Sequence, residues 1–209
     1  GPAGRRARPG AVRGYGPLRP PARPMTPTPP RLDVLALGEP MIEFNQTTPG
    51  RPGFLQGFGG DTSNAAIAAA RSGARAGVLT RVGDDAFGRM LLDLWRAEGV
   101  ATDGVAIDPS SHTAVYFVTH GPDGHAFSYL RTGSAASRMR PQDVPLELMR
   151  AARIVQASGI SLAISASACD AVLHAFDAAR AAGARIAFDS NLRLKLWPLA
   201  RARAMTAAA

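Results

Sequence analysis

Residues 57–64 read GFGGDTSN and run directly into the alanine-rich segment 65–71. Glycines, which have no side chains, stand immediately before a segment whose first turn is polar. This arrangement lets a small hydroxylated ligand approach the backbone, where Asp61 and Asn64 can hydrogen-bond to it. The start of a helix also carries unpaired N–H groups and partial positive charge, which favour anionic or strongly polar ligands. The stretch therefore predicts a pocket at a strand-to-helix turn.

Strand-like and helix-like segments alternate on both sides of this stretch. Apolar runs predict strands at residues 32–38, 76–82, 154–157 and 185–189. Helical spacing and capping residues predict helices at residues 62–72, 86–98, 167–182 and 200–209. We expect Asp61 or Thr62 to begin the first helix and Asp84 to cap the second. The alternation predicts an α/β fold with a doubly wound, mostly parallel sheet.

One segment interrupts this alternation. Residues 113–119 (TAVYFVT) and 125–131 (HAFSYLR) flank the turn residues 121–124 (GPDG), which is typical of an antiparallel hairpin. We expect the hairpin to leave the main sheet as a small β lid, with residues 56–58 as a further strand. The alternative is an ordinary extension of the sheet edge.

Three side chains of the hairpin favour the lid, because Tyr116, Tyr129 and Arg131 bring polar groups and a fixed cation to one small element. A guanidinium group matches the two oxygens of a carboxylate, so Arg131 and Tyr129 could clamp an acidic ligand. A lone arginine at a protein surface more often makes only a weak ion pair. The spacing alone leaves these two interpretations equal.

Polar residues also follow two of the predicted strands. Residues 189–193 (DSNLR) come after an apolar strand, and open α/β sheets bind ligands at that edge. Alternatively, Asp189 or Asn191 caps a following helix, and both could hold at once. Glu39 and Glu43 follow the first strand, where they either bind ligand or are solvated turn residues. Trp197 is expected to pack and to anchor the last helix.

The charge of the chain is unevenly distributed. The net charge of +8 over 209 residues invites a nucleic-acid interpretation. However, residues 1–31 contain seven arginines and no acidic residue, which leaves 17 basic and 16 acidic residues in the remainder. The Arg/Pro/Gly-rich segment 1–31 is expected to be disordered. We favour upstream sequence translated ahead of Met25 over a nucleic-acid-binding arm.

The remaining composition limits the function classes. No run approaches the ~20 uncharged residues of a membrane span, so no membrane partner is expected. Cys169 is the only cysteine, which fits a reducing cytoplasm, and a buried structural thiol is expected there. The histidines show no metal-ligand spacing (His112, His120, His125 and His174), so no metal site is assigned.

Five motifs in order resemble those of a known family. Residues 38–44 (GEPMIEF), 59–66 (GGDTSNAA) and 81–88 (RVGDDAFG) are similar to the ribokinase-like (PfkB) carbohydrate kinases. Residues 129–135 (YLRTGSA), and 189–193 with Trp197, most resemble the 2-keto-3-deoxygluconate kinases of that family. The resemblance extends over essentially all of residues 32–200.

The resemblance implies a central α/β sandwich with a small β lid, and transfer of the ATP γ-phosphoryl group to a sugar hydroxyl with Mg²⁺ assisting. The implied substrate is a sugar acid, 2-keto-3-deoxygluconate, converted to its 6-phosphate. A homodimer through the lid and a cytoplasmic location are also implied.

Site roles follow from the matching positions. Sugar hydroxyls would be bound by Gly59, Gly60 and Asn64, and the acid would be held from the lid by Tyr116, Tyr129 and Arg131. Asn191 and Arg193 would lie where the substrate and nucleotide sites meet, and Arg193 could stabilise charge on the substrate or on the transferring phosphoryl group.

The family's glycine-rich segment of the Asp-Thr-x-Gly-Ala-Gly-Asp type, which carries the general-base aspartate, has no counterpart in this sequence. We therefore expect residues 32–209 to be the N-terminal portion of a kinase domain, with lid segments at about 43–60 and 111–133, and to be nearly inactive alone.

Three alternatives remain. A dinucleotide-binding domain would need G-x-G-x-x-G directly after the first strand, which is absent. A non-catalytic domain with a nucleic-acid-binding tail is the second. A kinase of a neutral sugar, such as fructose or ribose, is the third.

Overall fold

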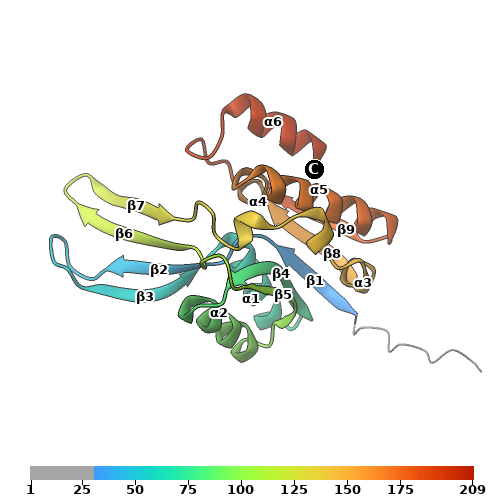
Figure 1. Ribbon diagram of the computed structural model, residues 1–209, viewed down its shortest axis with the longest axis horizontal. Coiled ribbons are helices and arrows are strands. Elements are labelled where there is room, and N and C mark those ends of the chain that lie inside the picture. Colours follow the sequence, from blue (N-terminus) through green and yellow to red (C-terminus); the bar gives the residue numbers. More distant parts are fainter. Residues whose placement is uncertain (1–30) are drawn as a thin grey trace, which may run out of the picture.

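The structure is a computed structural model that describes residues 31–209 (Figure 1). Apart from Arg31, the segment predicted to be disordered lies outside the described residues. No helix in the described part of the chain is long and apolar enough to cross a membrane.

The main sheet has five strands, all paired in parallel. In spatial order they are β5 (Ala101–Asp108), β4 (Ala76–Gly83), β1 (Leu32–Leu37), β8 (Ala152–Ser158) and β9 (Arg185–Asp189). Counted along the chain within this sheet, the order is 3-2-1-4-5. The connections therefore reverse direction between β1 and β8, and open α/β sheets bind ligands at such a switch point. The predicted parallel sheet is confirmed, although β5 was not predicted.

Helices cover both faces of this sheet (Figure 1). One face carries α1 (Asp61–Arg71) and α2 (Ala86–Ala97), and the other carries α4 (Gly159–Ala163), α5 (Ala166–Ala181) and α6 (Leu199–Ala208) with the short α3 (Leu146–Ala151). Side chains of β1 alternate between the two cores: Leu35 and Leu37 pack with α5, whereas Ala36 packs with α1. Cys169 and Trp197 are buried in the α5 core, as predicted.

A second sheet leaves the main one and extends to the left in Figure 1. Its order is β3 (Phe54–Gly59), β2 (Met41–Gln46), β6 (Val115–Gly121) and β7 (Gly124–Leu130). We call these four strands the lid sheet. The predicted hairpin is β6–β7, and the alternative of a main-sheet extension is wrong. Phe44 and Phe117 attach the lid sheet to α2, where Phe44 packs edge-on against Phe87.

Helix α1 begins at Asp61, as predicted, whereas the predicted cap of α2 is wrong. The N-cap of α1 is Gly60, with a positive φ of 101° and no side-chain cap, and a Cβ there would lie 2.6 Å from the Glu39 carbonyl oxygen. The side chain that caps α2 belongs to Asp85, which accepts from the Gly88 N–H at 2.7 Å. Asp84 instead pairs with Arg89 at the surface.

Three aspartates make the fold sensitive to acid. Hydrogen bonds from the Arg75 side chain lower the pKa of Asp33 to about 2, and those from Ser110 lower the pKa of Asp108. Burial alone would raise the pKa of Asp85, but the N–H groups of Thr113 and Gly88 lower it. A carboxyl whose folded pKa is depressed stabilises the fold above its unfolded pKa, and this stability is lost as the pH falls through the folded value.

We therefore expect the free energy of unfolding to fall steeply between about pH 4 and pH 2. Urea titrations at a series of pH values measure this, and Asp85→Asn and Asp108→Asn should each flatten the profile. Asp123→Asn, on the exposed lid turn, is the matched control. Parallel profiles for all three variants would contradict the assignment.

Candidate functional site

A cavity of about 780 Å³ lies at the carboxyl ends of the main-sheet strands. This is within the range of small-molecule sites, about 300–1,000 Å³. The cavity is lined by seven of the eight predicted site residues: Gly60, Asn64, Tyr116, Tyr129, Arg131, Asn191 and Arg193. The eighth, Gly59, does not line it. A Cβ at Gly59 would lie 2.5 Å from the Tyr116 ring, so this glycine makes room for the tyrosine.

The floor of the cavity is held together by Asp61 and Asn191. The Asn191 amide donates to the Asp61 carboxylate at 2.8 Å, and the Asn191 backbone N–H donates to Asp189 at 3.0 Å. Asn191 has a positive φ of 33°, a conformation that asparagine tolerates better than most residues. The alternative in which Asp189 or Asn191 caps a following helix is wrong, because α6 begins only at Leu199, after Pro198.

A close backbone approach fixes the same segment. A Cβ at Gly159, the first residue of α4, would lie 2.2 Å from the Ser190 carbonyl oxygen. Only glycine therefore allows α4 and the segment after β9 to come so near each other. Arg193 and Lys195 follow on this segment as exposed cations lining the cavity.

The other wall contains a buried ion pair. The Arg131 guanidinium donates from Nη2 to Glu39, and the Ser134 hydroxyl donates to the second Glu39 oxygen at 2.7 Å. The side chains of Arg131 and Glu39 are only 14% and 1% exposed. Burial raises the pKa of Glu39, and the Arg131 charge and the Ser134 hydrogen bond oppose that rise. Glu39 is therefore not a solvated turn residue, and Arg131 is not a lone surface arginine.

The lid sheet contributes an aromatic row. Tyr116 and Tyr129 are cross-strand partners with ring centroids 5.9 Å apart, and Phe127 stacks on Tyr129. The Arg131 guanidinium lies 5.5 Å from the Tyr129 centroid, within cation–π distance. Burial and the hydrogen bond to Glu43 raise the pKa of Tyr116.

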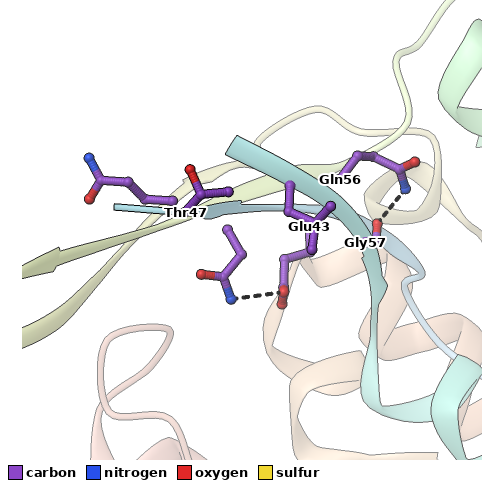
Figure 2. Close-up of a pocket in the computed structure, with 7 residues that line it drawn as sticks. Glu43, Thr47, Gln56 and Gly57 are labelled. Carbon is purple, nitrogen blue, oxygen red and sulfur yellow. Dashed lines mark hydrogen bonds between the residues drawn. The ribbon is translucent and has the colours of Figure 1, made fainter. Parts of the chain in front are cut away.

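Glu43 is engaged within the lid sheet. One of its oxygens accepts from Tyr116 and the other from Asn45 at 3.2 Å. Figure 2 shows the small pocket of about 170 Å³ that Glu43 shares with Thr47, Gln56 and Gly57. There the side-chain amide of Gln56 donates a hydrogen bond to the Gly57 carbonyl oxygen at 2.8 Å. Because both Glu43 oxygens have partners, we assign Glu43 to orienting Tyr116.

Sequence reasoning did not single out Lys195, Ser134 or the bond between Asp61 and Asn191. The predicted pocket at residues 57–64 gave a reason to inspect Asp61, but its partner is 130 residues away along the chain. Within residues 31–209, no group of three or more His, Cys, Asp or Glu side chains could hold a metal ion.

Comparisons with known proteins show which family this chain resembles. A family model described as "pfkB family carbohydrate kinase" matches residues 31–209. A 2-dehydro-3-deoxygluconokinase of Thermoproteus tenax is 42% identical over 180 residues, which are 82% of this chain and 54% of that protein. Fructokinase-2 of Solanum habrochaites is 38% identical over 174 residues, which are 80% of this chain and 52% of that protein.

Solved structures share the fold. The structure of a fructokinase with bound ATP from Xylella fastidiosa has a TM-score of 0.78 and 30% identity, over 85% of this chain and 56% of that chain. The chain spans about half the length of the curated relatives it matches.

Proposed function

Because this chain belongs to the pfkB family of carbohydrate kinases, we propose that the complete protein transfers the γ-phosphoryl group of ATP to a sugar acid. The proposed substrate is 2-keto-3-deoxygluconate, and the product is its 6-phosphate. The observation that carries this proposal is the nearly buried Arg131 guanidinium in the cavity wall, beside Tyr129 and Tyr116. A guanidinium fixed in this way suits the planar carboxylate that distinguishes a sugar acid from a neutral sugar.

The proposed roles follow from the cavity. Gly60 and Asn64, at the start of α1, bind sugar hydroxyls, and Tyr116, Tyr129 and Arg131 bind the acid from the lid sheet. Gly59 acts indirectly, by admitting the Tyr116 ring. We assign no general base among residues 31–209.

The segment after β9 fits the phosphates of ATP, because Arg193 and Lys195 bring two cations to the cavity beside Asn191. ATP supplies the phosphoryl group when bound. The fructokinase structure with bound ATP supports this cofactor. Mg²⁺ is expected to accompany ATP, but no described residue is assigned to it.

A homodimer through the lid sheet and a cytoplasmic location stay predictions. The lid sheet carries exposed apolar side chains at Leu55, Phe127 and Leu130 that a second copy could cover.

A kinase of a neutral sugar is the second candidate, because fructokinases are nearly as similar to this chain as the sugar-acid kinase. Calorimetric titration of the purified chain with 2-keto-3-deoxygluconate and with fructose separates the two. We expect the acid to bind at least about tenfold more tightly, since it gains a charge-assisted pair with Arg131. Arg131→Ala should abolish this preference, and Arg89→Ala, at a surface ion pair, should leave it unchanged. Equal or tighter binding of fructose by the unmodified chain would exclude the sugar acid.

A further inference from the structure

Glu39 is a buried acidic side chain in the wall of the cavity, and the proposed function gives it no role. It stands two residues beyond the end of β1, at the point where the connections of the main sheet reverse. Only 2% of the residue is exposed. A carboxylate so far from water needs a partner of opposite charge.

That partner is Arg131, 92 residues later in the chain. Arg131 Nη2 donates to one Glu39 oxygen, and the Ser134 hydroxyl donates to the other at 2.7 Å. Ser134 is itself held, because its hydroxyl accepts from the Ser137 N–H at 3.3 Å. Arg131 Nε is buried and has no hydrogen-bond partner among the described residues. Arg131 also lines the cavity, and its side chain is 14% exposed. Part of the guanidinium is therefore occupied by an internal anion, and the exposed part remains for a ligand.

We infer that Glu39 is the internal counter-ion of Arg131 and sets how strongly the cavity prefers an acidic sugar to a neutral one. This inference rests on the proposed function, in which Arg131 meets the substrate carboxylate. Such a carboxylate has to share the guanidinium with Glu39, so two anions lie beside one cation. A neutral sugar meets no such repulsion. Glu39 thus holds the guanidinium in place while it limits the gain from an acidic ligand.

Other charges around the cavity do not replace this effect. Asp61 adds a second negative charge, and Arg193 and Lys195 add positive charge from the opposite side. Arg193 and Lys195 are exposed, so water and salt screen them. Glu39 and Arg131 are in direct contact and nearly dry, where charges interact more strongly. The selectivity therefore depends mainly on this pair.

The test is Glu39→Gln, which removes the charge and keeps the shape of the side chain. We expect its affinity for 2-keto-3-deoxygluconate, measured by calorimetry on the 209-residue chain, to rise about tenfold, or about 1.4 kcal/mol. Its affinity for fructose should change by less than about twofold. Glu39→Asp keeps the charge but withdraws it from the guanidinium, so it should give a smaller rise, of about threefold. An equal loss of affinity for both sugars would show that Glu39 is only structural, and would overturn the inference.

Acetate, a bare carboxylate, separates this inference from the proposed substrate. Acetate should raise the unfolding temperature of Glu39→Gln more than that of the unmodified chain, because it binds the uncompensated guanidinium of the folded state. The rise should vanish in Glu39→Gln/Arg131→Leu. If the unmodified chain does not prefer the acid but acetate acts as expected, the proposed substrate fails and the inference stands. If acetate stabilises all three proteins equally, the inference fails. Should Glu39→Gln not fold, the graded response of Glu39→Asp decides, and an unchanged acid affinity there overturns the inference.

Discussion

Replacing Arg131 by alanine is expected to lower the free energy of unfolding by about 3–5 kcal/mol. The substitution leaves the Glu39 carboxylate buried with the Ser134 hydroxyl and without its cation. A buried charge that loses its partner keeps its desolvation penalty and loses the attraction that offset it. The effect should be far larger than that of a surface pair, about 0–1 kcal/mol, for which Arg89→Ala is the control.

Urea unfolding of a double-mutant cycle checks this expectation. Glu39→Gln/Arg131→Ala removes both charges, and its stability should recover well above that of Arg131→Ala. A double variant no more stable than the single one would mean that packing, rather than charge, accounts for the loss. The same measurements give the fraction of Arg131→Ala that is unfolded. Any apparent loss of affinity in this variant must be corrected for that fraction.

Replacing Trp95 by alanine is expected to cost about 3–5 kcal/mol of unfolding free energy. Trp95 lies on α2, is fully buried, and its indole N–H donates to the Ser63 hydroxyl at 2.9 Å. The substitution leaves a large cavity between α2 and α1 and an unsatisfied hydroxyl beside it. Trp95→Phe should cost less, because most of the ring volume remains.

Thermal and urea unfolding measure both variants at Trp95. Because Ser63 precedes Asn64 in the first turn of α1, Trp95→Ala should also weaken sugar binding, with Trp95→Phe intermediate. A loss below about 1 kcal/mol for the alanine variant would contradict the burial seen here.

Most of the main sheet could be predicted because its central strands are continuous apolar runs. β5 was missed, because it lies at the sheet edge, mixes exposed and buried positions, and contains Gly104. A Cβ at Gly104 would lie 2.5 Å from the Val78 carbonyl oxygen, so this glycine marks a close approach of β5 to β4 rather than a turn. That distinction depends on tertiary structure, which local sequence does not contain.

The site was predictable as a set of positions and less so as a set of contacts. Gly60, Tyr129 and Arg193 were expected near one another because the family resemblance assigns all three to one site, and they do line one cavity. The pairing of Arg131 with Glu39 joins residues 92 positions apart, and no spacing rule links them. The cap at Asp85 rather than Asp84 is a one-residue difference, decided by which carboxylate reaches both Gly88 and Thr113.

The two cores on opposite faces of the main sheet have a mechanical consequence. The lid sheet is rooted through Ile42 and Phe44 in the core beneath α1 and α2, whereas Trp197 anchors the segment after β9 in the core beneath α5. The two sides of the cavity are therefore anchored in separate cores on opposite faces of one sheet. The hydrogen bond between Asn191 and Asp61 links them directly. We expect a ligand that contacts both sides of the cavity to restrain the movement of one core relative to the other.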